Sequence, residues 1–151
     1  MNVDFTTAAE LLAICKKEVI SPGEAMLRRE ERLTGASRDE IRGRLSRSLE
    51  IMKAAAQTAL SAPQKTMGRS VAIAMGTLEV NASMGLIVAA PTAGSCGVLP
   101  GALLAQAEAF GFSDEELIDG LLTASAVGYL IARNATVAGA EGGCQAEVGV
   151  A

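Results

Sequence analysis

The chain has 151 residues, of which 50% are hydrophobic and 3% aromatic, and its formal net charge is −4. An acidic chain with so few aromatic side chains lacks the basic surface and stacking platforms that nucleic acids need, so nucleic acid is excluded as a partner. The apolar residues are mainly Ala, Leu, Val, Ile and Met, which favours closely packed helices, and the length is typical of one domain, residues 1–151.

Residues 1–62 have the pattern of three amphipathic helices. Each is opened by a Ser or Thr with a Glu three positions later, a capping box in which each side chain binds the other residue's backbone N–H. The pairs are Thr7 with Glu10, Ser21 with Glu24, and Ser37 with Glu40. Pro22 suits the first position of the second helix. The third helix carries an apolar stripe made of Ile41, Leu45, Leu49, Met52 and Ala56.

Residues 63–151 are richer in glycine and hold no charged residue between positions 80 and 107. So long an uncharged run raises the possibility of a membrane span, but Pro91, Pro100 and several glycines interrupt it, and we expect buried helices and no membrane partner. Helices are expected within residues 64–90, 97–110 and 112–134. The last begins with a Ser113–Glu116 box and has an apolar face formed by Leu117, Leu121, Ala124, Gly128 and Ile131. No strand alternation is present, so the sequence predicts an all-α fold.

The sequence contains no histidine and three cysteines, Cys15, Cys96 and Cys144. Without histidine the commonest general base is missing, so acid–base chemistry needs another group or another chain. An odd number of widely spaced cysteines, behind an N-terminus without the features of a signal peptide, predicts a cytoplasmic protein.

Two segments contain more glycine than helix packing requires, residues 89–103 and 139–149. In the first, Thr92, Ser95 and backbone N–H groups could converge on an anion, because a helix begins just after them. The alternative is a turn between two helices in a crowded interior. The glycine spacing matches neither the dinucleotide fingerprint nor the P-loop.

The second segment places Cys144 between small residues, with Gln145 and Glu147 close by. A thiolate in such a setting can bind a soft metal or act as a nucleophile. The alternative is that Cys144 is a small packing residue, as free cysteines usually are. We expect Cys96 and Cys15 to be packing residues.

The stretches "EVNASMGLIVAAPTAGSCGVLPGALL" and "NATVAGAEGGCQAEVGVA" resemble the α chain of the bacterial iron–sulfur L-serine dehydratases. Those enzymes deaminate L-serine to pyruvate and ammonia without pyridoxal phosphate. The resemblance implies a [4Fe–4S] cluster held by three cysteines, of which the first is Cys144 and the other two lie beyond residue 151. We therefore expect this chain to be the N-terminal portion of a longer α chain. The stretch at residues 62–65 is shorter than the family pattern.

The resemblance also implies roles for other residues. The cluster would act as a Lewis acid on the serine hydroxyl, and a histidine of a β chain would be the base, so an oligomer with that chain is expected. The substrate site would be lined by a loop consisting of Pro91, Thr92, Ala93, Gly94 and Ser95, with Thr92 and backbone amides meeting the serine carboxylate.

The sequence leaves two other functions to consider. A helical protein-interaction or assembly module would use its cysteines for packing only, and iron in the purified full-length protein would argue against it. A pyridoxal phosphate enzyme is disfavoured because no lysine lies in the Gly/Ser setting of a Schiff-base site; the lysines concerned are Lys16, Lys17, Lys53 and Lys65.

Overall fold

The computed structural model describes residues 4–57 and 66–151, and within these ranges it is helical with no β-strand. The helices are α1 (Ala8–Glu18), α2 (Pro22–Thr34), α3 (Arg38–Gln57), α4 (Thr66–Ala82), α5 (Val98–Phe110), α6 (Asp114–Asn134), α7 (Gly139–Gly142) and α8 (Cys144–Val150). The predicted all-α fold is confirmed. Among the described helices, none has both the length and the apolar character needed to cross a bilayer.

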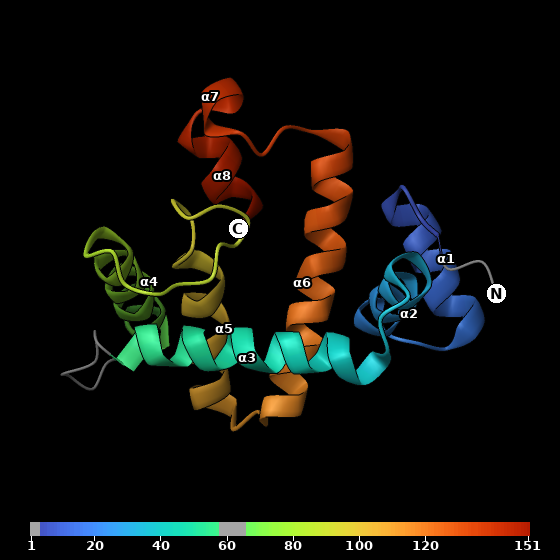
Figure 1. Cartoon of the computed structure of the whole chain (residues 1–151), viewed down its shortest axis with the longest axis horizontal. Helices are drawn as coiled ribbons and strands as arrows, with labels where there is room; N and C mark the ends of the chain where they lie inside the picture. Colours follow the sequence, from blue (N-terminus) through green and yellow to red (C-terminus); the bar gives the residue numbers. More distant parts are fainter. Residues whose placement is uncertain (1–3, 58–65) are drawn as a thin grey trace.

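Helix α3 lies across α5 and α6, as Figure 1 shows, and the remaining helices are arranged around these three. Helices α1 and α2 lie near one end of α3, with α2 packed on α6, and α4 lies near the other end, packed on α5. The short helices α7 and α8 follow α6 and lie beside the long loop between α4 and α5. The two Gly-rich segments of the sequence therefore come to the same part of the molecule.

Capping boxes open three of the helices as predicted. Ser37 N–H donates to Glu40 Oε2 at 2.8 Å, and Glu40 N–H donates back to Ser37 Oγ at 3.3 Å. The Thr7–Glu10 and Ser113–Glu116 pairs make the same reciprocal bonds. These side chains satisfy backbone donors that the first turn of a helix leaves without a partner.

The predicted box at Ser21 is only half formed. Ser21 Oγ accepts from Glu24 N–H at 3.1 Å, but the Glu24 carboxylate does not return to Ser21. It binds Arg38, at 2.8 and 2.9 Å, and Arg28, at 2.7 Å. Mainly because of Arg38, the pKa of Glu24 falls to about 2. Two charged guanidinium groups bind the carboxylate more strongly than one neutral N–H does. The ion pair between Glu24 and Arg38 connects α2 to the start of α3.

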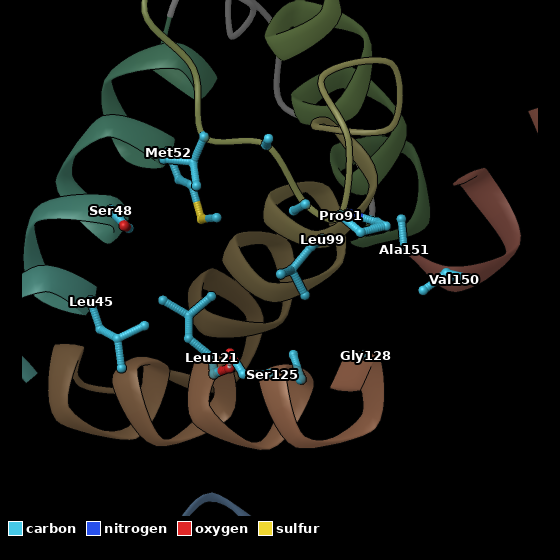
Figure 2. Close-up of a pocket in the computed structure, with 14 residues that line it drawn as sticks. Leu45, Ser48, Met52, Pro91, Leu99, Leu121, Ser125, Gly128, Val150 and Ala151 are labelled. Atoms are coloured by element: carbon cyan, nitrogen blue, oxygen red, sulfur yellow. Dashed lines mark hydrogen bonds between the residues drawn. The ribbon is translucent and has the colours of Figure 1, made fainter. Parts of the chain in front are cut away.

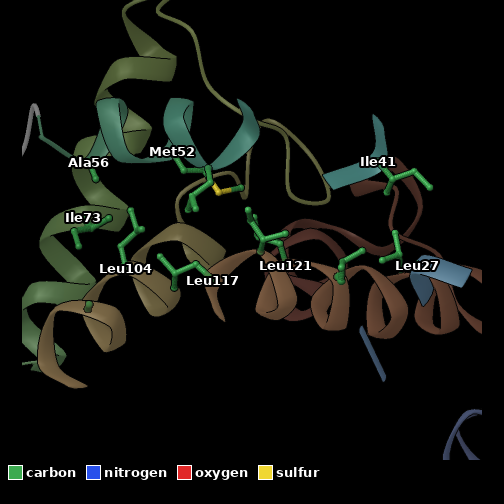
Figure 3. Close-up of a cluster of buried hydrophobic side chains, with 12 residues drawn as sticks. Leu27, Ile41, Met52, Ala56, Ile73, Leu104, Leu117 and Leu121 are labelled. Atoms are coloured by element: carbon green, nitrogen blue, oxygen red, sulfur yellow. The ribbon is translucent and has the colours of Figure 1, made fainter. Parts of the chain in front are cut away.

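The main hydrophobic core lies where α3 crosses α4, α5 and α6 (Figure 3). Four residues of the predicted α3 stripe are buried in it, while Leu45 packs against it and stays partly exposed. The buried members of the stripe are Ile41, Leu49, Met52 and Ala56. A smaller cluster under α1 and α2 includes Phe5, over whose ring lies the guanidinium of Arg29.

Helix α6 buries a second face that its sequence pattern did not predict. Leu117 and Leu121 lie in the main core as expected, but Ile118, Leu122 and Ala126 are buried as well. Helix α2 covers this further surface at close range: a Cβ built on Gly23 would lie 2.8 Å from Asp119 O. Because α6 is enclosed from two sides, its apolar residues are not confined to one stripe.

Helices α4 and α5 approach each other through glycines. A Cβ built on Gly97 would lie 2.3 Å from Ala74 O, and one on Gly101 would lie 2.7 Å from Ser70 O. Real Cβ atoms do not come so close to a carbonyl oxygen, so only glycine allows this crossing. The start of α5, and with it the end of the preceding loop, is thereby fixed against α4.

Replacing Leu49 by Ala should lower the free energy of unfolding by about 2–5 kcal/mol, because this side chain is buried and its removal leaves a cavity. Leu33→Ala is the matched control: this side chain is 53% exposed, so the change should be under about 0.5 kcal/mol. Urea denaturation followed by circular dichroism measures both. Equal effects of the two substitutions would contradict the core described above.

Replacing Gly97 by Ala should lower the free energy of unfolding by about 1–3 kcal/mol, because the new methyl group meets the backbone of α4. Gly43 lies in α3 with nothing within 4 Å of a built Cβ, so Gly43→Ala should raise it by about 0.5–1 kcal/mol through helix propensity. The same denaturation assay compares them. A stabilising Gly97→Ala would disprove the close crossing.

Candidate functional site

The loop between α4 and α5 is organised by the side chain of Ser95. This residue is 1% exposed, and its Oγ donates to Ala90 O at 3.0 Å. The same Oγ lies 3.2 Å from Thr92 Oγ1 and accepts from Thr92 N–H at 3.4 Å. The segment Pro91–Ser95, here called the PTAGS loop, is therefore held in a closed turn by its own last residue.

Two further contacts fix the PTAGS loop from outside. Asn81, at the end of α4, donates from Nδ2 to Ala93 O at 3.0 Å, and the close crossing at Gly97 holds the next residues. The loop then presents Pro91, Ala93 and Gly94 to solvent, with Thr92 half-buried. Of the five residues predicted to line a substrate site, the four from Pro91 to Gly94 are accessible and Ser95 faces inward.

The GGCQAE motif, residues 142–147, forms the junction between α7 and α8. Gly143 adopts φ = 70°, a conformation that favours glycine, and the chain turns there so that α8 starts at Cys144. Before the junction, the Thr136 hydroxyl donates to Glu141 and accepts from Ala138 N–H. Cys144 is exposed at the start of α8.

Glu147 brings the GGCQAE motif and the PTAGS loop together. A Cβ built on Gly94 would lie 2.9 Å from Glu147 Oε2, and one on Gly139 would lie 2.8 Å from Glu147 Oε1. The carboxylate thus lies between two glycines from distant parts of the chain. Cys144 stands three residues before Glu147 in the same helix, a spacing that puts two side chains on one face with about 5–6 Å between their Cβ atoms.

A cavity of about 240 Å³ lies behind the PTAGS loop, between α3, α5, α6 and the end of α8 (Figure 2). Pro91 and Val150 form part of its wall, and the polar side chains in its lining are those of Ser48 and Ser125. No charged side chain lines it. An apolar space of this kind does not suit a charged ligand.

The three cysteines have different surroundings. Cys96 is fully buried, and burial raises the pKa of its thiol, which keeps it protonated. Cys15 is half-buried against the smaller cluster. The positions of Cys96 and Cys15 fit the prediction that both are packing residues. Within residues 4–57 and 66–151, no group of three His, Cys, Asp or Glu side chains could hold a metal ion. Of the three cysteines, all of which the structure describes, Cys144 is the exposed one.

The family of serine dehydratase alpha chains matches residues 16–151 of this sequence. The chain belongs to the serine dehydratase alpha-chain family. It is 35% identical to the L-serine dehydratase alpha chain of Peptoniphilus asaccharolyticus, over 97% of this chain and 59% of that one. It is 36% identical to the probable L-serine dehydratase alpha chain of Bacillus subtilis, over 97% of this chain and 57% of that one.

The L-serine dehydratase of Helicobacter pylori is 35% identical over 98% of this chain and 39% of its own length. This member of the serine dehydratase alpha-chain family thus spans little more than half of the first two relatives. No solved structure matches it.

The relatives carry residues that this serine dehydratase alpha chain lacks. The alignment with the Peptoniphilus protein extends over 173 positions, more than the 151 residues of the whole chain. The sequence predicts a shortening at residues 62–65, which lie outside the described residues.

The sequence reading did not assign a role to Glu147 or to Asn81. The sequence places Glu147 near Cys144, but no local pattern points to Asn81. The helical spacing between Cys144 and Glu147 was visible in the sequence, but the approach of Gly94 depends on contacts between segments that are distant in the chain.

Proposed function

We propose that this chain is part of the α subunit of an iron–sulfur L-serine dehydratase, which deaminates L-serine to pyruvate and ammonia. In this proposal Cys144 is one ligand of a [4Fe–4S] cluster and the PTAGS loop receives the substrate. The observation that carries the proposal is the contact of Glu147 with Gly94, because it puts the segment of the cysteine beside the loop. The family membership and the names of the relatives support the same reaction.

The surroundings of Cys144 fit a cluster ligand. Its thiol is exposed, and the preceding Gly143 adopts the positive φ at which the chain turns into α8. One thiolate does not hold a cluster, and neither Cys96, which is buried, nor Cys15, on α1, is available beside it. The other ligands must then come from residues outside this sequence. When bound, the cluster would supply a Lewis acid to the substrate hydroxyl.

The PTAGS loop has the donors that a carboxylate needs. The N–H groups of Ala93 and Gly94 donate no hydrogen bond to the described residues, and both residues are exposed. The half-buried hydroxyl of Thr92 lies next to them. We propose that these groups bind the serine carboxylate, and that Pro91 and Ser95 contribute by shaping the loop.

This sequence lacks histidine, the commonest general base. We propose that a β chain supplies it, in a cytoplasmic assembly of both subunits. Two of the relatives are named as alpha chains, which supports a second type of subunit.

In the complete enzyme, Cys144→Ser should remove or degrade the cluster while leaving the fold intact, because serine is nearly the shape of cysteine but a poor ligand for iron. Iron per chain and pyruvate formation, measured after anaerobic reconstitution, should fall together. Cys15→Ser is the matched control and should keep both iron and activity. Full iron content in the Cys144 variant would make Cys144 a packing residue and favour the interaction-module alternative.

The 151-residue chain alone should form no pyruvate from L-serine, because it has neither a histidine base nor a complete set of cluster ligands. An anaerobic assay of the isolated chain, with iron and sulfide supplied, tests this. Addition of the missing α segment and the β chain should restore turnover. Steady pyruvate production by the isolated chain would refute the proposed division of the site.

A further inference from the structure

We propose that Glu147 receives the α-ammonium group of the amino-acid substrate, next to the carboxylate site on the PTAGS loop. This inference rests on the proposed function and adds to it a residue that recognises the amino group. It follows from where the Glu147 carboxylate lies, from its lack of a partner and from the chemistry of the substrate.

The carboxylate of Glu147 lies near the hydrogen-bond donors of the PTAGS loop. A Cβ built on Gly94 would contact Glu147 Oε2 at 2.9 Å and would lie 3.8 Å from Thr92 Oγ1. Both oxygens thus lie around the position that a Cβ would take on Gly94, and the N–H of Gly94 has no acceptor among the described residues. Because an α-amino acid carries its ammonium and carboxylate on one carbon, the two receiving groups must be close together, as they are here.

The Glu147 carboxylate has no partner in the described residues. No hydrogen bond or ion pair reaches it, and Arg133, the one basic residue in positions 70–151, is not paired with it. The side chain is half-buried, but its oxygens are open to solvent, since no unpartnered polar side-chain atom of the described part is sealed off. A ligand can therefore reach this charge.

Other carboxylates of the same half of the chain are in a different situation. Glu79, which also has no partner among the described residues, is exposed near the end of α4. The remaining acidic side chains are taken by neighbours, for example Glu108 by Arg69, Asp119 by Arg42 and Glu141 by Thr136. Glu147 alone combines partial burial, a free charge and contact with the PTAGS loop.

A cation would remove the cost of keeping this charge half-buried. A partly desolvated carboxylate without a counter-ion is unfavourable, and an ammonium group with three N–H donors compensates it. The other carboxylate oxygen lies against Gly139, where a built Cβ would be 2.8 Å from Glu147 Oε1. Glu147 would then select amino acids over hydroxy acids of the same shape.

The test replaces Glu147 by Gln in the complete enzyme, which keeps the shape and removes the charge. The KM and dissociation constant for L-serine should rise about 10- to 100-fold, the usual effect of losing a charge-assisted hydrogen bond. Iron content should be unchanged. The inhibition constant of 3-hydroxypropanoate, which is serine without its amino group, should stay within about twofold, because it does not use Glu147.

Glu141→Gln is the matched control, since Gln keeps an oxygen for the Thr136 hydroxyl, and it should bind L-serine as the unchanged enzyme does. Equal loss of affinity for L-serine and 3-hydroxypropanoate in the Glu147 variant would show a structural role and overturn the inference. Unchanged affinity of the Glu147 variant for L-serine would also overturn the inference. If the unchanged enzyme does not bind L-serine, the proposed function itself fails, and this inference with it.

Discussion

The backbone contact between α4 and α5 fixes most of what lies around the candidate site. Where Gly97 and Gly101 meet the carbonyl groups of Ala74 and Ser70, no side chain separates the two helices. The first turn of α5 therefore cannot shift along α4, and the PTAGS loop ends at a rigid point. Asn81 and Ser95 then need only close a short turn, which explains how a loop of small residues keeps a defined shape.

The rest of the fold supports this arrangement from behind. Helix α3 crosses α5 and α6 and buries Leu49 and Met52 between them, while α2 covers the other side of α6. Because α6 is held on both sides, its C-terminal end can carry α7 and α8 back to the loop, where Glu147 meets Gly94. The meeting of two Gly-rich segments thus depends on helices that contribute no chemistry themselves.

The site in this chain has some of the groups that the proposed reaction needs. Among the described residues it offers one exposed thiol, a loop with N–H donors that have no acceptor and a carboxylate without a partner, but the sequence has no histidine. In the proposed function, such a set would bind and orient the substrate and leave proton transfer to another chain. This division accounts for the absence of histidine without requiring that any residue here act as acid and base.

The sequence by itself determined α1, α2, α3 and α6, because caps and apolar spacing act within a few residues: Ser37 with Glu40 and the α3 stripe at Leu49 are local patterns. It did not predict α7 and α8, and it extended the segment of α4 to residue 90, whereas the helix ends at Ala82. It also singled out Cys144 and the PTAGS loop through glycine content and family resemblance. Tertiary structure decided the rest. The Glu24 carboxylate turned to Arg38, and Glu147 came to lie against Gly94, because both outcomes depend on which distant segments pack together, which no local pattern encodes.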